Sequence, residues 1–435
     1  MGKKNTALTF FKELPQNIFA GFVVSLVALP LALGLAIASE APPLAGIVAA
    51  VVGGVVVAVF GGSHITISGP GNGLVIVLLA AITSLGEGDL YQGYLFTLAA
   101  IILSGVLLFL FGALRLGAMS EFFPASALQG MLAAIGVGIL AKQFHVMLGL
   151  TSVSGDTIEQ LMRIPDSLLL FLGFHPFSGI IGVVSLLFLF FYSRIRSPYF
   201  HLIPAPMWVV VGSIGIGYYY QLVLKEVVPI APELLIKIPE KIISTLPRPN
   251  FGKLLDLDFL GVVISITLIA VIESLLSIKA VDKLDIKKRR SNVNKDLRAL
   301  GLASIISGFL GGLNVVTVIA RSSVNANNGG TNRSSNFFHA IFLMLFVLFL
   351  GDQIQRIPLT ALAAILVFTG YKLASPENLV RIYKIGPEQA LIFIITLVTT
   401  LFTSLVTGIT AGILSTFVTH LFLRKSLYLF SLNLF

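Results

Sequence analysis

The chain has 435 residues, of which 56% are hydrophobic and only 11% are charged, and its mean hydropathy is +0.97. Soluble globular proteins carry roughly 25% charged residues, so this composition excludes that class and predicts a polytopic membrane protein. The absence of Cys excludes disulfides and thiolate chemistry.

Fourteen apolar windows follow one another along the chain. They lie at residues 16–38, 43–61, 70–84, 93–114, 126–147, 176–194, 203–221, 258–279, 297–313, 316–326, 336–351, 358–373, 387–402 and 405–423. At about 20 residues per span plus short loops, a chain of this length has room for them all. We therefore expect an all-α membrane protein with 14 transmembrane segments. The first residues lead directly into a full-length span, and they do not resemble a cleaved signal.

Basic residues are concentrated between segments eight and nine, in a cluster made of Lys283, Lys287, Lys288, Arg289, Arg290, Lys295 and Arg298. No aromatic residues are interleaved with them, so nucleic-acid binding is not indicated despite the net charge of +9. The positive-inside rule predicts that this cluster and both termini are cytoplasmic.

The longest polar connection, residues 222–257, separates two sets of seven segments, 1–221 and 258–435. An odd number of spans per set gives the sets opposite orientations, which is the arrangement of inverted-repeat transporters. We therefore predict two inverted repeats joined by an extracytoplasmic loop.

Segment three begins unusually, with the sequence HITISGPGNGL at residues 64–74. A short β-like run comes first. Pro70 is suited to the first turn of a helix, which predicts a helix start at Pro70 or Gly71. The flanking glycines allow a ligand or a second chain to approach the backbone closely.

Segment ten carries Arg321 in an Asn- and Ser-rich stretch between two apolar segments. Only about ten residues, Val315 to Val324, are expected to be helical, too few to cross a bilayer core of about 30 Å. Segment ten is therefore predicted to be a half-helix, whose unpaired N–H groups favour an anion. If it faces the equally short segment three, both partial positive charges point into one central pocket.

These features make the chain similar to the sulfate permease (SulP) family of anion transporters, relatives of the vertebrate anion exchangers and prestin. The resemblance covers the whole chain. It is carried by the sequences VALPLALGLAIASEAPPLAGI at 27–47, ISGPGNGL at 67–74, AVIESLLSIKAVDKL at 270–284 and GGLNVVTVIARSSVNANNGGTNRSS from Gly311.

The resemblance implies the uracil-permease-like fold, with a core domain (segments 1–4 and 8–11) that moves against a gate domain (5–7 and 12–14) in an elevator-like manner. Asn314 and Leu31 stand where many members have Pro and Gln, respectively. The family's C-terminal STAS domain has no counterpart among the dozen or so residues after the last span, so the chain is either naturally short or trimmed.

The candidate anion-binding residues come from both half-helices: Ser68, Gly71, Asn72, Ala320, Arg321 and Ser322. Candidates for a coupling ion, Na⁺ or a proton, are Glu273, Ser277 and Thr317, with Na⁺ expected at Glu273 and Ser277. Ionisable residues at membrane depth are expensive and are usually functional.

Purely structural interpretations stay open for these residues. Glu273 could merely join two helices, Arg321 could be its structural counter-ion, and GPGNG could be only a tight turn. The six His residues are scattered without metal spacing, which favours interface or loop roles.

The function expected is secondary active transport of a small inorganic anion by a homodimer in a bacterial plasma membrane. Bicarbonate is the first candidate, because the Glu273 and Ser277 pair resembles that of Na⁺-coupled bicarbonate members. Sulfate, a dicarboxylate with a proton, and an uncoupled chloride channel or exchanger remain alternatives. A nucleobase permease is less expected, and an enzyme least, because no nucleophile, base and orienting group cluster together. No cofactor is expected.

Overall fold

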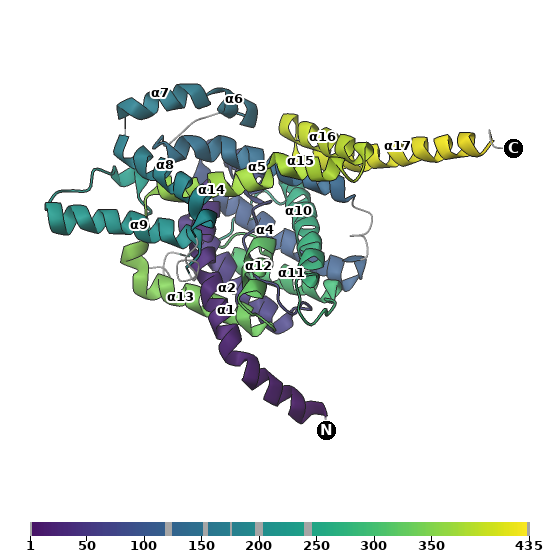
Figure 1. The fold of residues 1–435 in the computed structure, drawn as a ribbon, viewed down its shortest axis with the longest axis horizontal. Helices are drawn as coiled ribbons and strands as arrows, with labels where there is room; N and C mark the ends of the chain where they lie inside the picture. The colour runs from purple at the N-terminus through teal and green to yellow at the C-terminus, as the bar shows by residue number, and fades with distance from the viewer. Residues whose placement is uncertain are drawn as a thin grey trace.

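The computed structural model describes residues 2–117, 124–150, 155–174, 176–195, 203–238 and 246–432. They form a helical body in which α1 and α17 extend outward at the two ends of the chain (Figure 1). The helices of the first half are α1 (Gly2–Ala38), α2 (Pro43–Phe60), α3 (Val75–Gly86), α4 (Leu90–Ala113), α5 (Ala125–Met147), α6 (Thr157–Met162), α7 (Ile164–Phe174), α8 (Pro176–Phe191) and α9 (Ala205–Tyr219).

The second half continues with α10 (Leu257–Asp282), α11 (Val293–Phe309), α12 (Ile319–Asn327), α13 (Ser334–Ile354), α14 (Leu359–Leu373), α15 (Pro376–Tyr383), α16 (Pro387–Phe402) and α17 (Leu405–Leu432). Short turns η2 (Tyr192–Arg194), η4 (Tyr220–Leu224) and η5 (Pro232–Leu234) lie between them. Two strands, β1 (Ser68–Gly69) and β2 (Val316–Thr317), complete the described elements.

Eight helices of the described residues are long and apolar enough to cross a membrane, and four shorter apolar helices accompany them. This confirms an all-helical membrane protein with multiple apolar spans. Three helices, α6, α7 and α15, have no counterpart among the fourteen apolar windows. Part of the 222–257 connection, residues 239–245, lies outside the described residues.

Several long helices have side-chain caps at their starts. Asp89 accepts hydrogen bonds from the N–H groups of Tyr91 and Gln92 before α4, and Asn292 accepts one from Lys295 before α11. A capping side chain satisfies N–H groups that have no partner inside the helix. The starts of α3 and α12 have no side-chain cap, and the same holds for several other helices, among them α2, α5 and α14.

The helices pack in two groups. In one group, α4 packs on α3, α10 and α11, while α2 and α13 pack on each other and on α1. In the other, α5 packs on α14 and α16, with α8 against α14 and α17 against α16. Contacts of α1 with α9 and α14 join the groups.

The two strands bring the two chain halves together in the interior. They pair antiparallel, with Ser68 opposite Thr317 and Gly69 opposite Val316, and all four residues are buried. Helix α2 packs directly on this ladder. A Cβ atom at Gly53 would lie 2.6 Å from Cγ1 of Val315 and 3.3 Å from the Gly69 nitrogen, so glycine permits this close approach.

Both predicted half-helix starts are placed too early in the chain. Helix α3 starts at Val75 rather than at Pro70 or Gly71, after a turn in which the Val75 N–H donates to the Asn72 carbonyl. Helix α12 starts at Ile319 rather than at Val315. At α12 the reason is the β1–β2 ladder, which holds Val316 and Thr317 extended. At α3 a turn over residues 72–74 separates the ladder from the helix. Helix α12 has only 9 residues, too few to cross a bilayer core of about 30 Å.

Candidate functional site

Helix α12 presents an uncapped N-terminus to an accessible space. Ile319 is 39% exposed, and Ala320 is also exposed, although the ladder immediately before them is buried. The residue before the helix, Val318, offers no side-chain acceptor to the first N–H groups. These N–H groups carry the partial positive charge of the helix start, so this end of α12 can receive an anion.

Arg321 lies directly behind this exposed turn and is only 1% exposed. Its guanidinium is placed against the ladder: a Cβ atom at Gly69 would lie 2.5 Å from Nη1 of Arg321. None of its three nitrogens has a hydrogen-bond partner among the described residues. A buried cation without partners is strongly unfavourable, so a group of opposite charge would be stabilised beside Arg321.

Glu273 of α10 is placed at the other half-helix. Its Oε1 accepts a hydrogen bond of 3.4 Å from the Gly73 N–H, and the Asn72 N–H lies beside the same carboxylate. A Cβ atom at Gly71 or Gly73 would lie 2.6 or 2.8 Å from Oε2, so both glycines are needed for this approach. The carboxylate therefore occupies the position at the α3 start where the sequence predicts an anion.

Glu273 and Arg321 are within electrostatic reach of each other, but no ion pair joins their side chains in the described part of the chain. A role of Arg321 as the structural counter-ion of Glu273, acting without a direct hydrogen bond, stays an alternative. Each charge faces its own half-helix.

The other candidates for the coupling ion lie close to the ladder. Thr317 is fully buried, its hydroxyl has no partner, and its N–H donates to Oγ of Ser274 at 3.5 Å. Ser277, one turn beyond Glu273, is 2% exposed. The structure adds Ser274 to this group, a residue that the sequence analysis does not single out.

Two serines among the predicted anion contacts have partners within the protein. The Ser322 hydroxyl donates to the Val318 carbonyl at 2.7 Å and accepts from the Ile67 N–H at 2.9 Å, so its proton is not available to an anion. The Ser68 N–H donates to Oδ1 of Asn336 at 3.2 Å, whereas the Ser68 hydroxyl has no partner. Gly71 is buried and Asn72 partly buried, both beside Glu273.

Two further polar side chains near the site, Asn336 and His339, come from α13 and are at most 1% exposed. The expectation that the His residues occupy interfaces or loops is wrong for His339 and for His145, which is 1% exposed and contacts Ser167 and Gln160. The position of Asn336 and His339 inside an apolar span is the signal that points to them.

Buried carboxylates outside the ladder have partners. Asp296 accepts from the Gly62 and Ser63 N–H groups and from the Ser63 hydroxyl. In the loop after α10, burial raises the pKa of the Asp285 carboxyl, but hydrogen bonds from Arg289 and from the Lys287 N–H outweigh it and hold the pKa below its ordinary value. Both carboxylates thus have hydrogen-bond donors, whereas Arg321 has no acceptor among the described residues.

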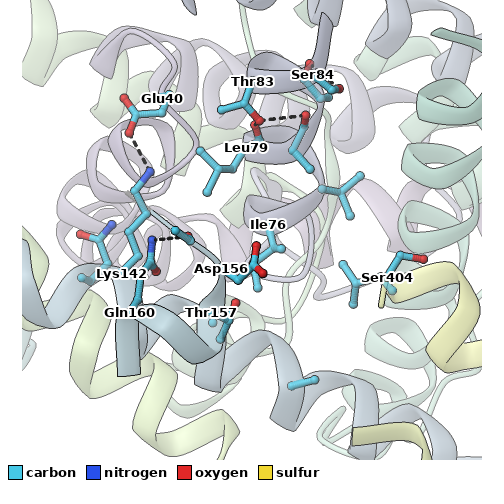
Figure 2. A pocket seen from close by; sticks show the side chains of 18 of the residues that line it. Glu40, Ile76, Leu79, Thr83, Ser84, Lys142, Asp156, Thr157, Gln160 and Ser404 are labelled. Atoms are coloured by element: carbon cyan, nitrogen blue, oxygen red, sulfur yellow. Dashed lines mark hydrogen bonds and ion pairs between the residues drawn. The ribbon is translucent and has the colours of Figure 1, made fainter. Parts of the chain in front are cut away.

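A cavity of about 1140 Å³ opens between α3, α5, α6, α10 and the start of α17. Figure 2 shows its polar wall, where Lys142 of α5 forms an ion pair with Glu40, at 2.6 Å, just beyond the end of α1. On α3 the cavity reaches Ile76, and on α10 it reaches Ser265, two turns before Glu273. Its lining includes neither Arg321 nor Glu273.

The sulfate permease family model matches residues 14–396. The chain is 26% identical over 388 residues to YvdB, a putative sulfate transporter of Bacillus subtilis. The matched region covers 88% of this chain and 69% of that protein. It is 25% identical over 391 residues to the bicarbonate transporter BicA of Picosynechococcus sp., covering 88% and 66%. The chain thus spans about two thirds of the length of these relatives.

Solved structures show the same fold. The transmembrane domain of a cyanobacterial bicarbonate transporter BicA matches with a TM-score of 0.78 at 24% identity, over 93% of this chain and 98% of that one. The murine anion transporter Slc26a9 in the inward-facing state matches with a TM-score of 0.79 at 16% identity, over 95% and 70%. Because its family model covers most of the chain, this integral membrane protein belongs to the sulfate permease family, whose members are anion transporters and not enzymes.

Proposed function

We propose that this protein is a secondary active transporter that binds a small inorganic anion at the start of α12. The observation that carries the proposal is the Arg321 guanidinium, buried without a partner behind an exposed and uncapped helix start. A planar guanidinium can bind two oxygens of an oxyanion at once, and the helix N–H groups can hold another.

Glu273 supplies the coupling in this proposal. Its carboxylate stabilises the α3 start through the Gly73 N–H, and its second oxygen has no partner. That oxygen can receive a proton, or it can bind Na⁺ together with the Thr317 hydroxyl and Ser277. Carrying a cation with the anion reduces the net charge moved through the membrane field.

Bicarbonate is the substrate proposed first and sulfate second. The relatives include a bicarbonate transporter and a putative sulfate transporter, and both anions offer several oxygens to Arg321. A dicarboxylate with a proton is a further alternative within the same class.

The transport movement proposed is elevator-like, between two inverted repeats of seven segments. The helix group around α4 and α2 would form the core, and the group around α5 and α14 the gate. Two features support this division: the most extensive helix packing lies within each group rather than between them, and the site belongs to the first group. A homodimer is also expected.

The experiment is uptake of labelled bicarbonate and of labelled sulfate into proteoliposomes, with and without a Na⁺ gradient and a pH gradient. Accumulation of one anion that depends on one gradient supports coupled transport. Uptake that only equilibrates the anion, unchanged by either gradient, would instead establish an uncoupled channel or exchanger and remove the role of Glu273.

The repeat arrangement has its own test, which uses the absence of native Cys. Single cysteines are placed at Val227, which is 92% exposed, and at Asn292 in the basic loop. An impermeant thiol reagent outside the cell should label only the Val227→Cys protein, because the positive-inside rule puts the basic loop in the cytoplasm. Labelling of both from outside would mean an even number of spans between them and would rule out the inverted repeat.

A further inference from the structure

The first turns of α13 are held rigidly against two neighbouring helices. A Cβ atom at Gly21 of α1 would lie 2.7 Å from the Ser335 carbonyl oxygen, and one at Gly54 of α2 would lie 2.8 Å from the Asn336 carbonyl oxygen. The glycines allow these close approaches. Asn336 and His339 are three residues apart and therefore share one face of α13.

Asn336 connects this face to the anion site. Its Oδ1 accepts the Ser68 N–H at 3.2 Å, which fixes the orientation of the amide. Its Nδ2 is left without an acceptor. Since Nη1 of Arg321 lies against Gly69, the residue after Ser68, Asn336 and Arg321 flank consecutive residues of β1.

His339 extends the same wall by one turn. It is fully buried, and neither of its ring nitrogens has a hydrogen-bond partner in the described structure. The Asn336 carbonyl lies beside the ring but outside hydrogen-bond geometry, and Arg321 is within electrostatic reach. Buried polar groups in proteins are nearly always paired, so three neighbouring side chains without acceptors require an explanation.

We infer that Asn336 and His339 form, with Arg321, an inner wall of hydrogen-bond donors that makes the site select oxyanions over halides. The inference rests on the proposed function. Arg has five N–H donors, the Asn amide two and a neutral imidazole one. A bicarbonate or sulfate ion offers separate oxygens to such divergent donors, whereas a chloride ion offers a single centre. His339 is thus a specificity-determining residue.

The test compares affinities for oxyanion and halide in proteoliposomes. Labelled bicarbonate and sulfate uptake gives the KM of the oxyanion, and competition by chloride gives its inhibition constant. The variants are His339→Phe, which removes the donor, and His339→Gln, which keeps one. His339→Met is a second apolar variant if the Phe protein does not fold. The control is Leu343→Met, at a fully buried apolar position one turn later.

His339→Phe should raise the oxyanion KM about tenfold, the value of one hydrogen bond to a charged group, and leave chloride inhibition unchanged. His339→Gln should restore part of the loss, and Leu343→Met should behave as the native protein. Equal weakening of oxyanion and chloride would mean a merely structural role, and no change in either would mean that water alone occupies this wall. Either result overturns the inference while the proposed function stands. Wild-type protein that transports no oxyanion overturns both.

Discussion

The starts of α3 and α12 occupy equivalent places in the two halves of the chain, but the charged groups beside them have opposite signs. Each is a short helix after a strand of the β1–β2 ladder, and neither has a side-chain cap from its preceding residue. At α3 the carboxylate of Glu273 lies on the backbone N–H groups. At α12 the first turn is exposed, and the cation behind it has no partner.

The difference shows that two equal helix ends do not make two equal anion sites. A negative charge at a helix N-terminus is worth about 0.3–1 kcal/mol, and up to about 2 kcal/mol when partly buried. The protein supplies that charge from its own chain at α3, and at α12 it leaves the position to a substrate. In the proposed function, one end serves coupling and the other serves anion binding, and the following substitutions should separate these two roles.

The largest effect is expected for Arg321→Ala. It removes the buried charge and two charge-assisted hydrogen bonds to the anion, so affinity should fall by about 100-fold or more. Arg321→Lys should recover only part of it, because Lys keeps the charge without the planar fork. Substrate affinity of the purified, folded variants is the measurement, and native affinity in Arg321→Ala would refute the assignment.

Glu273→Gln should act on coupling instead. Gln keeps the shape and can still accept the Gly73 N–H, but it loses the negative charge that pairs with a proton or Na⁺. We expect uptake to lose its dependence on the driving gradient while anion affinity stays within about threefold of native, since Arg321 is untouched. The measurement compares the rate of substrate counterflow with the rate of gradient-driven uptake in the same vesicles. A Gln variant that still concentrates substrate would exclude Glu273 from coupling.

A smaller and more selective effect is expected from two glycine-to-alanine variants, one on the ladder and one in the turn before α3. Gly69→Ala places a Cβ atom 2.5 Å from Nη1 of Arg321, whereas Gly73→Ala places one 2.8 Å from Oε2 of Glu273. Displacing either charge from its helix end should cost ~1 kcal/mol, or about fivefold. Gly69→Ala should weaken anion affinity, and Gly73→Ala should weaken the response to the driving ion. Identical kinetic defects in both variants would mean that the two ends are not separate.

The long helices follow from the sequence because continuous apolar composition decides them locally. The windows at 93–114 and 126–147, for example, correspond to Leu90–Ala113 and Ala125–Met147. The choice of Arg321 and Glu273 as candidates follows from the cost of charge at membrane depth. Family membership is confirmed as well.

The details of the site depend on contacts far apart in the chain. Pro70 is a good first helical residue, but the paired strand around Thr317 and the carboxylate of Glu273 determine the backbone there instead. The scattered His residues of the sequence do not indicate that His339 is buried. Its burial results from the packing of α13 on α1 and α2. Ser322 is predicted from the sequence as an anion contact, but its hydroxyl donates to the Val318 carbonyl and accepts from the Ile67 N–H.

The most direct test asks which helix end the anion covers. Ala320→Cys at the exposed start of α12 and Asn72→Cys at the partly buried turn before α3 are each treated with a small thiol reagent, with and without bicarbonate or sulfate. The anion should slow thiol modification at position 320 and leave the rate of modification at position 72 unchanged. Protection of position 72 with none at position 320 would place the anion at α3 and contradict the division of roles between the two helices.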